Sequence, residues 1–122
     1  MAKFEFKNRD CVLEIAEHEY TVTCNSDMAD RLIELGQQQT ALFEDFEAGR
    51  ISKDDVLKKY CEQIDCLLGA GESETLLKNS KSKFNDAADI LMFISGELTG
   101  WFKAHSNRAT RRAAAKSKNG RK

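Results

Sequence analysis

Apolar residues recur every three or four positions in three separate segments, and this spacing constrains the fold more than any other feature of the chain. The segments are residues 27–48, 53–68 and 86–102. Such spacing places apolar side chains on one face of a helix, so we predict three helices that bury these faces against one another. The side chains expected to be mostly buried are Leu32, Leu35, Leu42, Phe46, Leu57, Tyr60, Ile64, Leu68, Ile90, Ile94, Leu98 and Trp101.

Residues 3–24 differ from the rest because β-branched and aromatic residues alternate there with polar ones. This alternation is typical of strands, and it predicts an antiparallel β-ribbon of two or three short strands. Pairing of residues 11–15 with 20–24 across a turn at Glu17-His18 would place Cys11 opposite Cys24. A ribbon of this size must pack on other elements to be stable.

These elements predict an α+β fold, mainly α, with the β-ribbon packed on a body of three to four helices. Residues 1–102 form a single globular domain in this prediction, with a short acidic helix over 72–79, and 103–122 form a basic tail that is helical or disordered. The longest apolar stretch has five residues, Ile90 to Ile94. A membrane-spanning helix needs about 20, so we expect no contact with a membrane. The N-terminal residues also lack the apolar core of a secretory signal, and we expect a cytoplasmic protein.

Charge divides unevenly along the chain, although the total is only −1. Residues 103–122 contain eight basic residues and no acidic one, whereas the first 102 residues contain 11 basic and 20 acidic ones. Such an asymmetry often marks an interaction tail. The candidate basic contacts are Arg108, Arg111, Arg112 and Lys116. Nucleic acid, an acidic partner, the acidic body of a second copy, and simple solvation of the tail all remain open as roles.

Motifs for catalysis or cofactor binding are missing from the sequence. There is no nucleophile elbow, Walker loop, dinucleotide fingerprint or HExxH motif. The four cysteines form no CxxC pair, and His18 and His105 lie far from them in sequence, so we expect small buried thiols and neither a metal nor another cofactor. Paired carboxylates such as Asp54-Asp55 fit helix starts and solvated faces. We therefore expect a protein that is not an enzyme.

A binding role is suggested instead by apolar residues that fall off the helical stripes or at their edges. The candidate partner-binding residues are Met28, Phe43, Met92 and Phe93. Met92 and Phe93 would make the last helix apolar on more than one side, and an exposed apolar surface is costly in solubility unless it is covered. A second copy or a helical segment of another protein could cover it, so we expect a homo-oligomer.

The order of these elements resembles that of the small tail assembly chaperones of long-tailed bacteriophages. The resemblance covers residues 3–112: a short β-ribbon, a compact acidic helical body, and a terminal Asn-Arg-Ala-Thr-Arg-Arg segment at 107–112. It implies a non-catalytic protein of the host-cell cytoplasm that coats apolar stretches of the tape measure protein and helps to recruit tail tube subunits.

Two other classes fit the sequence as well. A small nucleic-acid-binding or regulatory protein would act through its basic tail, although the charge of −9 on residues 1–102 repels phosphate, and we expect nucleic-acid binding to be weak or absent. A structural virion protein, such as a head–tail connector subunit, is the third class.

Overall fold

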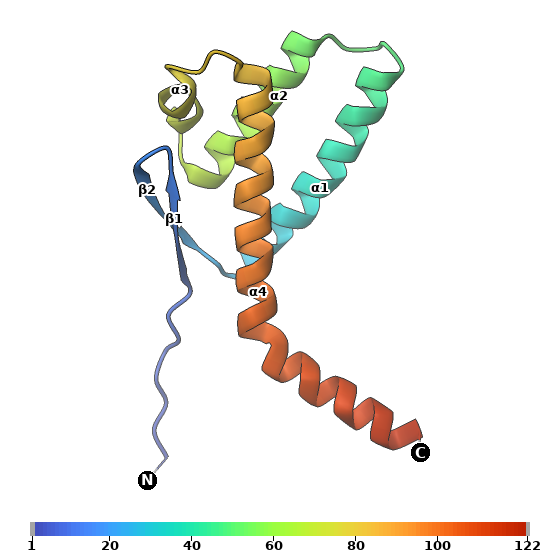
Figure 1. Cartoon of the computed structure of the whole chain (residues 1–122). Helices are drawn as coiled ribbons and strands as arrows, with labels where there is room; N and C mark the ends of the chain where they lie inside the picture. Colours follow the sequence, from blue (N-terminus) through green and yellow to red (C-terminus); the bar gives the residue numbers. More distant parts are fainter. Residues whose placement is uncertain (1, 122) are drawn as a thin grey trace.

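The chain folds into a two-stranded β-ribbon and four helices (Figure 1). The structure, a computed structural model, describes the backbone of residues 2–121 and the side chains of residues 2–105. The elements in chain order are β1 (Asp10–Ile15), β2 (His18–Thr23), α1 (Ser26–Glu47), α2 (Lys53–Leu68), α3 (Glu72–Leu77) and α4 (Lys83–Arg121). The α+β, mainly α prediction is therefore confirmed, and α2 has the predicted bounds.

The β-ribbon is shorter than predicted, and its register differs. Residues 3–9 form neither strand nor helix, because six-residue β2 pairs fully with β1 and leaves them without a partner strand. The turn lies at Ala16 and Glu17, whose φ angles of 49° and 68° suit a tight hairpin. Cys11 therefore lies opposite Val22, and the prediction that it lies opposite Cys24 is wrong.

One face of the ribbon packs into the core, as the period-two alternation of side chains requires. Leu13, Ile15, Val22 and Cys24 are buried, whereas Val12 on the other face is largely exposed. In Figure 1 the ribbon lies beside α4, on the side away from α1. The buried ribbon residues belong to the same apolar cluster as residues from all four helices.

Helix ends follow from local hydrogen bonds. The side chain of Asn25 accepts a hydrogen bond from the Met28 N–H and starts α1. Ser52 and Asp55 form a reciprocal capping box that starts α2. α4 begins at Lys83, earlier than the predicted residue 86, because Ser82 O accepts from the Asp86 N–H. α4 also extends past the predicted end at 102, to Arg121.

α4 supplies the centre of the core. Ala87, Leu91, Ile94 and Leu98 are 0–1% exposed, at the three- and four-residue spacing that defines one helix face. They pack with α2, where Ile64 is also fully buried.

The predicted burial is confirmed for one part of the predicted set, and other members are only half-buried. Leu35, Ile64, Ile94 and Leu98 are buried. The half-buried members of the predicted set are Leu32, Leu42, Leu57, Tyr60, Leu68, Ile90 and Trp101. Phe46 is 39% exposed, so its predicted burial is wrong. Its ring lies at the end of α1, and the centroid is 6.3 Å from that of Phe84.

None of the helices in the described part of the chain is both long enough and apolar enough to cross a membrane.

Candidate functional site: a groove between two helices

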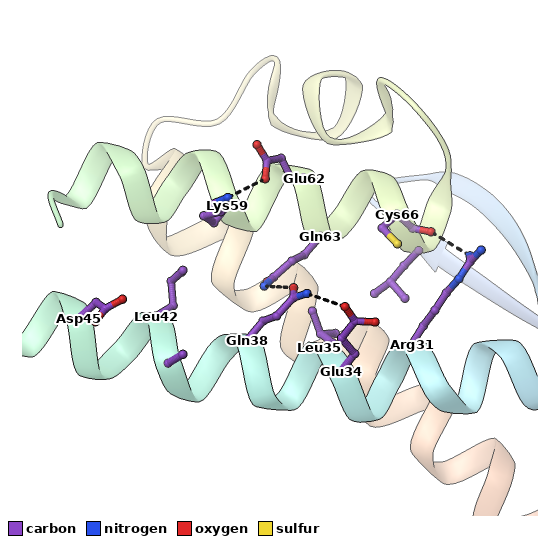
Figure 2. A pocket seen from close by; sticks show the side chains of 12 residues that line it. Arg31, Glu34, Leu35, Gln38, Leu42, Asp45, Lys59, Glu62, Gln63 and Cys66 are labelled. Atoms are coloured by element: carbon purple, nitrogen blue, oxygen red, sulfur yellow. Dashed lines mark hydrogen bonds and ion pairs between the residues drawn. The ribbon is translucent and has the colours of Figure 1, made fainter. Parts of the chain in front are cut away.

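A groove of about 520 Å³ runs between α1 and α2, and we call it the α1–α2 groove (Figure 2). Buried Leu35 and Leu67 form its bottom, together with half-buried Leu42 and with Ala41. Polar and charged side chains surround this aliphatic strip: Arg31, Glu34, Gln38, Asp45, Lys59, Glu62, Gln63 and Cys66. The site is thus an apolar channel with a charged rim.

The two walls follow from how the helices present their faces. Residues 31, 34/35, 38, 41/42 and 45 of α1 recur at three and four positions, so they form one continuous strip along the helix. Residues 59, 62/63 and 66/67 form the facing strip on α2. The centroid of the Phe84 ring lies 5.8 Å from that of Tyr60 on α2. The Lys53 ammonium lies 4.9 Å from the centroid of the Phe84 ring.

The rim charges are partly engaged with neighbours in the protein. Lys59 lies 3.4 Å from Glu62, one turn away on α2. Asp45 binds Arg50 through contacts of 2.8 and 2.9 Å to the same oxygen. Arg31 reaches across the groove to the carbonyl oxygen of Cys66, at 3.5 Å. All of these groups are exposed, so each ion pair contributes little stability and can exchange partners.

Two side-chain hydrogen bonds connect the two walls of the groove. Gln38 on α1 donates to Glu34 at 3.2 Å, and Gln63 on α2 donates to the Gln38 side-chain oxygen at 3.4 Å (Figure 2). A carboxylate can only accept hydrogen bonds, so it fixes the orientation of Gln38 and, through it, that of Gln63. Gln63 Oε1 is left buried and accepts no hydrogen bond from the described part of the protein. Gln63 itself is only 6% exposed.

The predicted partner-binding residues lie outside the α1–α2 groove. Phe43 is 64% exposed and Met92 73%, whereas Phe93 is 41% exposed. Met92 and Phe93 are adjacent on one helix and therefore project about 100° apart. Met28 is 7% exposed and belongs to the core cluster with Val22 and Cys24, so it is unavailable as a contact residue. None of these four residues lines the α1–α2 groove.

The predicted basic contacts Arg108, Arg111, Arg112 and Lys116 lie outside the residues whose side chains the structure describes.

A second pocket, of about 450 Å³, lies where the N-terminal segment, the start of α1 and residues 101–105 of α4 meet. Lys7, Arg9 and His105 give it a basic lining. The His105 ring stacks on Trp101 with centroids 3.9 Å apart, and its Nδ1 lies 2.8 Å from the Trp101 carbonyl oxygen. The ring is therefore held by its own helix.

The cysteines are free thiols, but only Cys24 is buried. Cys11 and Cys61 are half-buried and Cys66 is exposed, so the prediction of a buried thiol is wrong for Cys66. Burial raises the pKa of Cys11, Cys24 and Cys61, and brings that of Cys24 to about 11. A nucleophilic cysteine requires the opposite shift, because the thiolate is the reactive form. No group of three or more His, Cys, Asp or Glu residues suited to a metal ion occurs among the described residues.

Comparisons of this chain with protein-family models, with curated proteins and with solved structures give no match. The functional argument therefore depends on the chain itself.

Proposed function

We propose that this protein is a non-catalytic assembly chaperone that binds an apolar helical segment of a partner protein in the α1–α2 groove. The observation that carries the proposal is the form of the groove, in which leucines line the bottom and charged residues line the rim. An amphipathic helix binds such a groove by laying its apolar face on the bottom. Its polar face then remains at the rim, in contact with water.

The resemblance to tail assembly chaperones indicates which partner to test. On that basis the proposed client is the tape measure protein of a long-tailed bacteriophage, and the tail tube protein is a second partner. The protein acts in the cytoplasm of the host cell in this proposal. It requires no cofactor and no membrane.

Exposed apolar side chains outside the groove support binding to a long client. Ile33, Phe43 and Met92 are each more than 60% exposed, on α1 and α4. A client segment longer than the groove would find further apolar contacts on the outer faces of these two helices.

Binding of a synthetic amphipathic helical peptide with leucines every three or four positions tests the proposal. Ala41→Arg places a long charged side chain in the groove and should weaken binding at least tenfold, measured by fluorescence anisotropy. Thr40→Arg is the matched control, because Thr40 is exposed on the same helix and does not line the groove. Equal affinities for the two variants, or no binding by the unaltered protein, would contradict the proposal. Pull-down of the tape measure protein with the same variants then tests the identity of the client.

The basic lining of the second pocket and the basic tail favour one alternative, a nucleic-acid-binding or regulatory protein. The acidic charge of residues 1–102 opposes it. Tight binding to a defined DNA or RNA sequence at physiological salt would establish this alternative. Detection of this protein as a stable component of purified virions would instead establish that it is a structural virion protein, such as a connector subunit.

A further inference from the structure

α1 is acidic along its whole length, and two of its carboxylates, Glu34 and Asp45, line the groove beside Arg31. The chain also carries a segment of opposite charge. α1 contains six carboxylates and one basic residue, Arg31. Residues 103–122 contain eight basic residues and no acidic one. Two surfaces with this complementarity attract each other, and salt weakens the attraction.

One residue that lines the groove, Gln63, has a side-chain acceptor that lacks a hydrogen-bond donor. Gln63 Oε1 is buried, and the described part of the protein donates nothing to it. A buried acceptor without a partner is costly, so a ligand that displaces the side chains covering Gln63 Oε1 and supplies a donor there gains affinity. Arginine and lysine side chains carry donors only.

We infer that the C-terminal segment of a second copy, residues 107–118, binds in the α1–α2 groove, with an arginine of that segment donating to Gln63 Oε1. The inference rests on the proposed function of the groove and names its regulation, since the segment competes there with the client. The segment fits in size because alanines at 109 and 113–115 allow its backbone to approach the leucines closely. Its arginines then reach the carboxylates of α1.

The occupant is a second copy because a single chain cannot cover its own groove. α4 extends to Arg121 as one helical element, and in Figure 1 its C-terminal end points away from α1 and α2. Binding of a tail to the groove of the next copy joins two different surfaces. Such a contact leaves a free tail and a free groove, so assemblies grow with concentration unless they close into a ring.

Sedimentation velocity of the full chain at rising protein concentration tests the inference. The unaltered protein should associate in low salt and dissociate in high salt. The triple variant Arg108→Gln, Arg111→Gln, Arg112→Gln should remain monomeric. Its matched control, Lys3→Gln, Lys58→Gln, Lys81→Gln, removes the same charge from exposed positions in residues 1–102 and should associate at least as strongly as the unaltered protein.

Gln63→Met locates the contact, because methionine fills the same space and cannot accept the proposed hydrogen bond. It should weaken association about tenfold, as expected for loss of a hydrogen bond to a charged group. Thermal unfolding should show a fold of similar stability, because removal of a buried unpaired acceptor offsets the lost hydrogen bond to Gln38. Gln37→Met, at an exposed position on α1 outside the groove, should leave association unchanged.

The helical peptide separates this inference from the proposed function. If the tail competes for the groove, the triple arginine variant binds the peptide more tightly than the unaltered protein does. A protein that stays monomeric in low salt, or associates equally with and without the three arginines, overturns the tail inference. Equal association by Gln63→Met and Gln37→Met overturns the proposed contact. Peptide binding in any of these cases leaves the proposed function intact, whereas a monomeric variant that fails to bind the peptide contradicts that function.

Discussion

The phenol of Tyr20 on β2 donates a hydrogen bond of 2.9 Å to Glu72 Oε2 at the start of α3. The two residues are 52 positions apart in sequence, so this bond joins the ribbon to the short helix that follows α2. Burial, together with Glu72, raises the pKa of Tyr20 to about 12.

The stability contributed by Tyr20 should therefore decrease at high pH. The folded pKa lies above the ordinary value of about 10, so the contribution is fully present below pH 10 and is lost as the pH rises from 10 to 12. Urea unfolding at pH 8 should show the unaltered protein to be more stable than Tyr20→Phe. That difference should shrink by pH 11.5. Because Cys11 and Cys24 titrate in both proteins, the difference isolates Tyr20; a constant difference would contradict the prediction.

Ile94 is fully buried at the centre of the core, and neighbouring Met92 is 73% exposed. Ile94→Ala should lower the free energy of unfolding by about 2–5 kcal/mol, the range for a large aliphatic residue in a packed core. Met92→Ala, a truncation on the same helix, should change it by about 0.5 kcal/mol or less. Chemical denaturation measures both, and a loss below about 1 kcal/mol for Ile94→Ala would mean that α4 does not supply the core.

Two glycines with open surroundings should respond oppositely to alanine. Gly36 lies inside α1, where alanine is favoured by about 0.5–1 kcal/mol. Gly49 follows α1 with φ of 74°, a conformation that costs an L-residue about 1–2 kcal/mol. Gly36→Ala should raise the melting temperature and Gly49→Ala should lower it. Shifts of the same sign would contradict the described geometry of this helix end.

Among the three predicted contact residues that are exposed, Phe93 is the most covered by its neighbours. Phe93→Asp should leave the far-ultraviolet circular dichroism unchanged and weaken binding of a helical peptide longer than the groove, because it removes apolar surface from α4 outside the groove. Gly96→Asp adds the same charge at an exposed position of that helix and should leave peptide binding unchanged. If Phe93→Asp unfolds the protein, Phe93 is a core residue and the outer face of α4 takes no part.

The helices were predictable because periodic apolar residues and caps are local features. Asn25 and Ser52, residue types that favour helix starts, cap α1 and α2, and the inner residues of α4 are buried. The hairpin register was not predictable, since Ala16 and Glu17 are unusual residues for left-handed turn conformations. Because of this error in register, the predicted partner of each β1 residue differs from the observed partner by two positions; for Cys11 the predicted partner is Cys24 and the observed one is Val22.

The groove could not be predicted from the sequence, for a different reason. Its existence depends on how far α1 and α2 diverge, and apolar spacing defines which faces approach without defining their distance. Leu42 illustrates the point: its place in the stripe predicted burial, but the separation of the two helices leaves it half-buried in the groove. Likewise, Met28 lies at the edge of the stripe, and only the packed cluster with Val22 and Cys24 shows that it is buried.

The buried residues of α1 are unevenly distributed, with Met28 and Leu35 both in its first half. The second half forms a wall of the groove without a buried anchor of its own, so its local opening requires less free energy than opening of α4. Backbone amides near Ala41 should accordingly exchange with deuterium faster than those near Ile94. Under the proposed function, this half-helix is the part of the groove that adjusts its position to helices of different diameter along one long client, while the core stays packed.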